Sequence, residues 1–437
     1  MKPTSYSYGD RLRETLRAQL SSARKETDRL FQMLSPAAIY ERPIPERHRI
    51  VFYLWHLEAF DWNMICGAGF GISSSNSEFE RLFAFGIDPV DGKLPEDKPK
   101  DWPGVEEIHR YNRQVRRTVD ELLDREPLES GELFRMAIEH RLMHAETLAY
   151  MLQWLPYEVK GHAALPGDTT QPPPEPREVE IPAGRATLGQ NRDGEFSFGW
   201  DNEFQKHTVF VPEFSIDAFN VTNRQFLEFL ATGGYEQRMF WDDDSWEWMR
   251  TGEIRHPKFW IERGGEWLYR TMFAEIPLPL AWPVYVSHAE AEAYARWARR
   301  SLPTEAQYHR AAFGSADGAE RLYPWGNGDP MPHHGNFDFQ SWTPGSIGGF
   351  PAGQSEFGVF DLCGNGWEWT GTPFEPFAGF EPFPFYPGYS ADFFDGKHFV
   401  LKGASPRTSA LLVRRPFRNW FQPHYPNIYA TFRCVEN

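Results

Sequence analysis

The first third of the chain carries apolar side chains with the period of a helix. Between residues 10 and 34, apolar residues recur at intervals of three, four or seven positions, at Leu12, Leu16, Leu20, Ala23, Leu30 and Leu34. Three more helices are predicted, from about 46 to 65, 105 to 124 and 132 to 154. The segment 66–103 is rich in Gly, Ser, Pro and Asp, which predicts an irregular excursion. Four helices with one long crossover indicate a four-helix bundle.

The pattern changes after the bundle. The segment 161–178 contains five prolines and few apolar residues, so it is predicted to be an extended linker. From residue 179 onwards, short apolar runs are separated by Gly, Pro and Asn, with helical periodicity at 222–231 and 288–299. We therefore predict a multi-domain chain: an all-α bundle over 1–160, a linker over 161–178 and an α+β domain over 179–437.

Three histidines of the bundle have the spacing of a metal site. His140 and His144 are four residues apart on one predicted helix, which places their Cβ atoms about 5–6 Å apart on one face. Glu146 lies about 240° round the helix from His140, too far to be a third ligand. His56, in the apolar run 52–60, is the natural third ligand. A core histidine bonded to a carbonyl, or a solvated helix face, remains the alternative interpretation.

The ligand types leave the metal open. Three imidazoles without a thiolate suit Zn²⁺, Fe²⁺ or Cu²⁺, and the spacing does not choose between them. Three protein ligands leave coordination positions open, as catalytic sites do. Of the three cysteines, none is close to another in sequence, so no disulfide framework or CxxC site is predicted.

The charge balance excludes several kinds of partner. The formal net charge is −16 and Lys and Arg form no long block, so neither a nucleic acid nor an anionic membrane is an expected partner. There is no run of 18 apolar residues, and residues 1–10 lack an apolar signal core. We expect a soluble, cytoplasmic protein.

Six segments of the last part of the chain resemble the formylglycine-generating-enzyme-like fold, which is related to C-type lectins. They are 181–184 (IPAG), 219–223 (FNVTN), 300–308 (RSLPTEAQY), 323–327 (YPWGN), 363–370 (CGNGWEWT) and 432–434 (FRC). Gly366 stands where the family has valine. The late cysteine pair that carries out formylglycine formation has no counterpart, so that activity is disfavoured.

The first third resembles the DinB-like bundle, and the two folds in this order resemble the nonheme iron sulfoxide synthases of ergothioneine biosynthesis and their selenoneine-pathway relatives. The resemblance implies an Fe²⁺ centre held by His56, His140 and His144, with O₂ as co-substrate. It implies that hercynine (Nα-trimethylhistidine) is coupled at imidazole C2 to a sulfur or selenium donor, giving a sulfoxide or selenoxide. We also allow for structural Ca²⁺ in the second domain.

The resemblance also assigns substrate residues. The family uses a tyrosine pair before the final strands, and Tyr386 and Tyr389 match this pair. The resemblance implies that Tyr386 is the catalytic proton donor and that Tyr389 contacts the substrate. The Arg-Asn-Trp motif matches Asn419 and Trp420, which would hold the betaine through its carboxylate and its trimethylammonium group. In an aromatic-rich domain, simple packing is the alternative role of Tyr386, Tyr389 and Trp420.

Departures from the family pattern concern the donor. Members that use γ-glutamylcysteine have an aspartate after Arg-Asn-Trp and two arginines in the loop after the first helices. Here Phe421 takes the place of the aspartate, and Arg81 is the single arginine of 66–104. We therefore favour a seleno- or thiosugar donor and selenoneine biosynthesis, with cysteine or γ-glutamylcysteine as the alternative. The family can also place a glutamine just before the last histidine ligand, where this chain has Met143; this departure concerns the contacts to the imidazole.

Two other functions are compatible with the sequence. A zinc-dependent DinB-like thiol S-transferase would use the three histidines but not the tyrosine pair or the Arg-Asn-Trp segment. A non-catalytic binding module would use the second domain alone, since this fold also occurs in sugar-binding and scaffold proteins. Metal content and hercynine-dependent O₂ uptake separate these possibilities.

Overall fold

The computed structural model describes residues 8–73, 96–125, 131–161, 169–194, 196 and 198–436. The chain divides into two compact units, Met1–Ala163 and Ala164–Asn437. Arg81, a candidate donor contact, lies outside the described residues.

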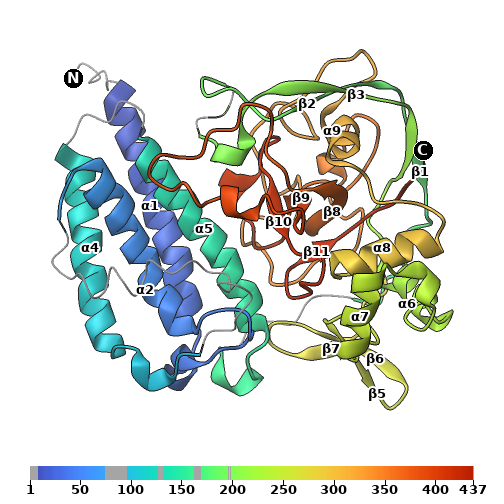
Figure 1. The fold of residues 1–437 in the computed structure, drawn as a ribbon, viewed down its shortest axis with the longest axis horizontal. Coiled ribbons are helices and arrows are strands. Elements are labelled where there is room, and N and C mark those ends of the chain that lie inside the picture. The colour runs from blue at the N-terminus through green and yellow to red at the C-terminus, as the bar shows by residue number, and fades with distance from the viewer. Residues whose placement is uncertain are drawn as a thin grey trace. The chain divides into compact units, whose positions relative to one another are not determined.

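The first unit is a helical bundle, which confirms the predicted fold of this part. Its long helices are α1 (Tyr8–Gln32), α2 (Ile50–Asp61), α4 (Val105–Arg125) and α5 (Glu132–Gln153) (Figure 1). α1 packs against α5, and α2 packs against both α4 and α5. The connections contain three short 3-10 helices: η1 (Pro36–Tyr40), η4 (Pro99–Asp101) and η5 (Tyr157–Val159).

The central helix α2 differs from its predicted bounds at both ends. It begins at Ile50 rather than near 46, because Arg49 is still extended, with φ −63° and ψ 154°. Every residue of α2 is buried, which explains the apolar run read from the sequence. The chain then continues through Gly69 as a π-helix, η2 (Trp62–Gly69). Such widened turns are frequent at functional sites.

The second unit is built on a four-stranded sheet with the order β10-β9-β8-β11. Its strands are β8 (Gly366–Pro373), β9 (Phe399–Ala404), β10 (Asn419–Phe421) and β11 (Ala430–Thr431), of which only β11 pairs in parallel. Figure 1 shows this sheet in orange and red at the centre of the unit. The segment that carries Asn419, Trp420 and Phe421 is thus an edge strand, with Trp420 opposite Val400.

Three smaller sheets surround this one. β1 (Glu178–Ile181), β4 (Phe214–Asp217) and β12 (Val435–Glu436) form the first, with β4 in the middle. β2 (Gly184–Leu188) pairs with β3 (His207–Val211), and β5 (Trp260–Arg263), β6 (Glu266–Arg270) and β7 (Glu275–Pro277) form a meander. The predicted apolar runs of 179–216 are the strands β1 to β4. The many short strands confirm the α+β class.

Four helices complete the second unit: α6 (Asn223–Ala231), α7 (Asp243–Thr251), α8 (His288–Trp297) and α9 (Glu305–Phe313). Thr222, Ser287 and Thr304 cap α6, α8 and α9, each with a capping box. α6 and α8 were predicted, whereas α7 and α9 were not. In α9, eight of the nine residues are buried, so no exposed polar face reveals its period.

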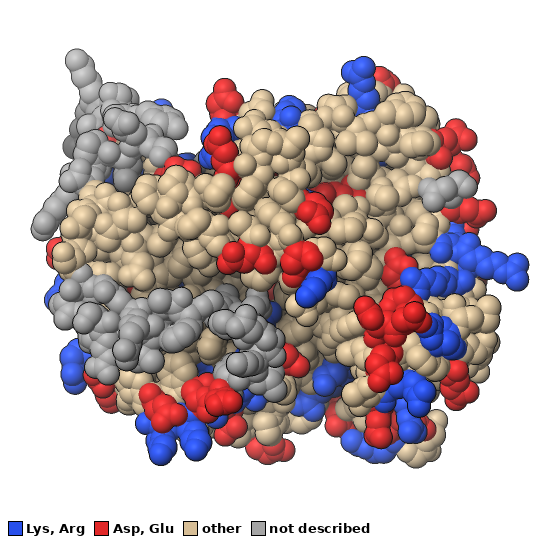
Figure 2. All heavy atoms as spheres, in the orientation of Figure 1, with Lys and Arg blue, Asp and Glu red and all other residues tan. Residues whose placement is uncertain are grey.

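Charged side chains are mixed on the surface. On the face shown in Figure 2, Lys and Arg are interspersed with Asp and Glu, and neither sign forms a continuous field among the described residues. None of the helices in the described part of the chain is long and apolar enough to cross a membrane.

Candidate functional site

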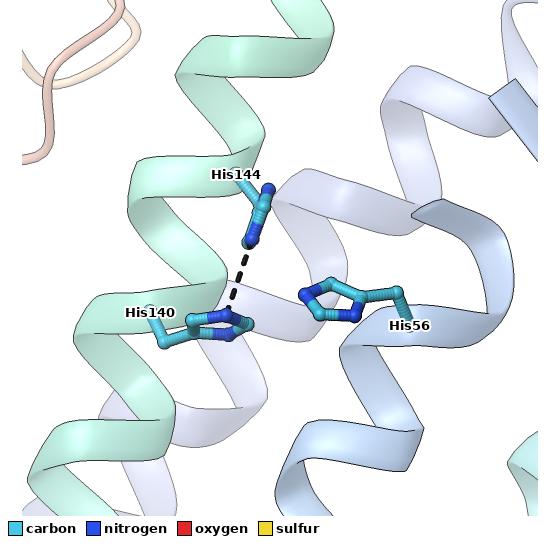
Figure 3. A group of neighbouring side chains, drawn as sticks. All are labelled: His56, His140 and His144. Atoms are coloured by element: carbon cyan, nitrogen blue, oxygen red, sulfur yellow. Dashed lines mark hydrogen bonds between the residues drawn. The ribbon is translucent and has the colours of Figure 1, made fainter. Parts of the chain in front are cut away.

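The three predicted ligands meet inside the helical unit. His56 comes from α2, whereas His140 and His144 come from successive turns of α5 (Figure 3). One ring nitrogen from each lies within 4.8 Å of the others. Among the described residues, this is the one group of three or more His, Cys, Asp or Glu side chains so arranged. The i, i+4 spacing did bring two imidazoles to one face of the helix.

Aromatic neighbours fix the orientation of two of the rings. The His56 imidazole stacks on Phe52, with centroids 4.8 Å apart and planes 19° apart. His140 stacks on Phe60 at 3.5 Å and 8°. Because Phe52 and Phe60 lie one turn before and after His56 on α2, the same helix supplies one of the three histidines and the rings that stack on His56 and His140.

Burial keeps the three imidazoles neutral. Desolvation lowers the pKa of His56 to about 3, with further lowering by His48 and Arg141. Burial also lowers the pKa of His140 and His144 well below the usual range. A neutral imidazole has a free lone pair, which is the form that binds a metal ion.

The ring nitrogens are suited to a metal because most of them have no hydrogen-bond partner among the described residues. This holds for both nitrogens of His56 and for Nδ1 of His140 and of His144. The Nε2 atoms of His140 and His144 are 3.1 Å apart. Buried polar groups are seldom left unpaired, since each costs about 1–3 kcal/mol. Three such imidazoles with converging nitrogens are suited to hold one cation.

A buried ion-pair network lies on the same two helices. Arg141 of α5, fully buried, donates from Nη2 to Asp61 Oδ2 of α2 at 2.7 Å and lies 3.2 Å from Glu58 Oε2. Arg116 of α4 reaches Glu58 at 2.5 Å and pairs with Asp28 of α1 through two bonds of 2.7 Å. Since Arg141 lies next to His140, this network connects the histidine-bearing turns of α2 and α5.

Replacing Arg141 with methionine is expected to destabilise the protein by about 3–5 kcal/mol, because removal of one partner leaves buried carboxylates uncompensated. Burial already raises the pKa of Asp61 in spite of Arg141. The measurement is urea unfolding followed by far-UV circular dichroism. Arg17→Met is the matched control, because its partner Asp124 is exposed and such pairs contribute about 0–1 kcal/mol. Equal stability of the two variants would contradict the role given to the network.

The predicted substrate residues of the second unit also lie near one another. Tyr386 and Tyr389 are half-buried on the loop before β9, which we call the tyrosine loop. Their ring centroids are 5.7 Å apart. Tyr389 meets the half-buried Trp420 edge to face at 5.3 Å. Trp420 stacks on Phe374 at 4.2 Å and 7°. The three rings from the tyrosine loop and from β10 thus form one aromatic wall.

The remaining predicted positions are placed as follows. Asn419 is half-buried, and its Oδ1 accepts a hydrogen bond from the Trp420 backbone N–H at 2.9 Å. Phe421 stacks in parallel on Tyr425, with centroids 5.4 Å apart and planes 2° apart. Met143 is half-buried on α5, directly before His144.

Sequence reasoning missed the segment 200–203 (WDNE), which is buried and contacts the aromatic wall. Trp200 stacks on Tyr389 with centroids 4.0 Å apart. The segment forms a short 3-10 helix, η6 (Asp201–Glu203), and its four side chains are at most 1% exposed. Two acidic residues separated by one asparagine, Asp201 and Glu203, within an aromatic-rich stretch were the available signal.

Both halves of the chain match known families. Residues 162–437 match the sulfatase-modifying factor enzyme 1-like domain, and residues 19–165 match the DinB superfamily. The hercynine oxygenase of Mycolicibacterium thermoresistibile is 36% identical over 341 residues, which cover 75% of this chain and 74% of that protein. The hercynine oxygenase of Mycolicibacterium smegmatis is 31% identical over 435 residues, 97% and 99% of the two chains. The chain belongs to the hercynine oxygenase family.

A fungal relative extends the comparison. The ergothioneine biosynthesis protein 1 of Neurospora crassa is 27% identical over 499 residues, which cover 93% of this chain and 56% of that protein. This member of the hercynine oxygenase family therefore corresponds to about half of the fungal protein. The expected combination of a DinB-like bundle and a formylglycine-generating-enzyme-like domain is confirmed. All three cysteines are buried and free, so the described part contains no disulfide.

Proposed function

We propose that this protein uses iron(II) and O₂ to couple a selenium or sulfur donor to imidazole C2 of hercynine, giving a selenoxide or sulfoxide. The observation that carries the proposal is the set of three buried, neutral histidines, four of whose six ring nitrogens have no hydrogen-bond partner in the described part of the chain. It occurs in a chain whose relatives are hercynine oxygenases. Iron bound there would supply the activation and reduction of O₂.

The overall reaction balances with O₂ as the oxidant. One hydrogen leaves imidazole C2 and one leaves the donor thiol or selenol, while the carbon–chalcogen bond forms. One oxygen atom enters the product on the chalcogen, and the other leaves as water. Bond formation and chalcogen oxidation each release two electrons, which together reduce one O₂.

In this proposal the helical unit holds the metal and the second unit holds hercynine. His56, His140 and His144 would each give one nitrogen to iron. Trp420 would face the trimethylammonium group, an attraction worth about 0.5–2 kcal/mol. The Asn419 side chain would donate to the carboxylate, and Tyr389 would contact the imidazole.

Tyr386 is the proposed proton donor. A phenol keeps its proton at neutral pH and can give it up in the transition state of O₂ reduction. Its ring centroid lies 5.7 Å from that of Tyr389, so a substrate imidazole at Tyr389 would be close to the Tyr386 side chain. Delivery of this proton would direct turnover towards coupling instead of simple oxidation of the donor.

Phe421 supports an uncharged donor. A carboxylate at this position would pair with the ammonium group of a cysteine-type donor, and a phenyl ring cannot. The half-buried Phe421 ring, stacked on Tyr425, is apolar and uncharged, which suits the C–H face of a sugar. We therefore favour a seleno- or thiosugar, and selenoneine as the downstream product. Cysteine or γ-glutamylcysteine remains the alternative within the same reaction.

Replacing Phe421 with aspartate is expected to shift donor preference towards γ-glutamylcysteine by about tenfold or more, because a new charge-assisted hydrogen bond contributes about 1.5–3 kcal/mol. The measurement is kcat/KM for γ-glutamylcysteine, cysteine, thioglucose and selenoglucose at fixed hercynine. Phe421→Leu is the control, since it removes the ring but keeps an apolar side chain and adds no charge. If both variants change all donors in the same proportion, Phe421 does not select the donor.

A further inference from the structure

The buried segment 200–203 meets both parts of the proposed hercynine site. On one side, Trp200 stacks on Tyr389 of the tyrosine loop. On the other, the Asn202 carbonyl oxygen accepts from Arg418 Nη1 at 3.4 Å, two residues before Trp420. Neither contact is local in sequence, since 189 residues separate Trp200 from Tyr389 and 216 separate Asn202 from Arg418.

Segment 200–203 is hydrogen-bonded to the tyrosine loop at Ser390. Its hydroxyl donates to Asp201 Oδ1 and accepts from Asn202 Nδ2 at 3.0 Å. Both the donor and the acceptor capacity of the hydroxyl are thereby used, which fixes its rotamer. Ser390 is fully buried and directly follows Tyr389. We call Asp201, Asn202 and Ser390 the Ser390 anchor.

Segment 200–203 is itself fixed by hydrogen bonds to Glu203. Glu203 accepts from Arg414 through Nε at 2.9 Å and Nη2 at 2.5 Å. Its Oε1 also accepts from the Trp200 backbone N–H at 3.0 Å, and its Oε2 accepts from Gln190 Nε2 at 3.2 Å. A bidentate Arg–carboxylate pair with further bonds is a geometrically specific attachment. The anchor therefore presents a fixed surface to the loop.

We propose that the Ser390 anchor is the positioning element of the tyrosine loop, setting where Tyr386 and Tyr389 stand relative to Trp420. This inference rests on the proposed function, because it assigns the anchor a task in hercynine binding and proton delivery. Asp201, Asn202 and Ser390 touch no reacting atom in this account. They act through the two tyrosines.

The cost of the anchor favours a task beyond packing. Asp201 is fully buried, and burial raises the pKa of its carboxyl to about 6 in spite of the bond from Ser390. Glu203 raises it further. A buried carboxylate is expensive to desolvate, and an apolar pair would fill the space at lower cost. Unlike an apolar side chain, the Asp201 carboxylate accepts a hydrogen bond from Ser390 and so fixes the direction of its hydroxyl.

Ser390→Ala tests the inference without removing any proposed substrate contact. The matched control is Ser215→Ala, because Ser215 is also buried in this unit and its hydroxyl donates to a carboxylate, Glu178, at 3.1 Å. The first readout is hydrogen exchange of peptides spanning 383–394 in the full chain. We expect at least tenfold faster exchange in Ser390→Ala and no change in Ser215→Ala.

The second readout is the ratio of coupled product to oxidised donor at saturating hercynine. A merely structural defect lowers the active fraction but leaves this ratio unchanged. We expect the ratio to fall at least fivefold in Ser390→Ala and, less strongly, in Asn202→Ala, which removes only the donor to the Ser390 hydroxyl. An unchanged ratio and unchanged exchange in both variants would overturn the inference.

Different results would contradict the proposed function and the role of the Ser390 anchor. If the wild-type protein loaded with iron couples no donor to hercynine, the proposed function is wrong, whatever the variants do. If the wild type couples and Ser390→Ala matches Ser215→Ala in exchange and product ratio, only the anchor's role is wrong.

Discussion

Replacing His144 with alanine is expected to abolish iron retention and coupling together. The variant leaves two imidazoles, and open catalytic sites with three protein ligands have no spare ligand to compensate. The affinity for Fe²⁺ should fall at least 100-fold. The fold should persist, because the His144 ring has no described hydrogen-bond partner apart from His140, its neighbour in the ligand set.

The measurement is iron per chain after anaerobic loading and gel filtration, with coupling activity on the same samples. His424→Ala is the matched control, since His424 is a half-buried histidine of the second unit that stacks on Trp248 at 4.9 Å. The wild type and the control should hold about one iron per chain and His144→Ala close to none. Full iron and full activity in His144→Ala would show that the metal site is misassigned.

Replacing Tyr386 with phenylalanine is expected to divert turnover from coupling to oxidation of the donor. The change removes one hydroxyl and keeps the ring against Tyr389, so hercynine should still bind with little change in Kd. General acid catalysis contributes about 10²–10⁴-fold, so the coupled product should fall from the main product to a trace.

The products are separated by mass spectrometry, and hercynine binding is followed by calorimetry. Tyr323→Phe is the control, because Tyr323 is a buried tyrosine of the same unit whose ring stacks on Trp325. An unchanged product ratio in Tyr386→Phe would remove Tyr386 from the mechanism. A large loss of hercynine affinity would assign it to binding instead.

Local patterns in the sequence accounted for most of the helical unit. The period of apolar residues placed the four long helices within a few residues, and the i, i+4 rule brought His140 and His144 together. His56 was harder to place from pattern alone, because α2 is buried on all sides and has no polar face to orient it. Its apolar surroundings were the clue that an imidazole there needs a partner.

The second unit was less predictable because its site depends on long-range contacts. Asp201 and Ser390 are 189 residues apart, and no local period connects them. Trp200 and Tyr389 meet for the same reason without any pattern in the sequence. α9 was missed because burial on all sides removes the amphipathic signal. The tyrosine loop and β10 were found through family motifs and not through periodicity.

The most direct test of the central claim is O₂ uptake by the iron-loaded wild-type protein, with each donor of the panel and with or without hercynine, coupled to mass analysis of the product. We predict hercynine-dependent uptake of one O₂ per coupled product, and a product mass equal to hercynine plus donor plus one oxygen, less two hydrogens. The sugar donors should react fastest. Hercynine left unconsumed with every donor, or activity that requires zinc and no O₂, would contradict the account.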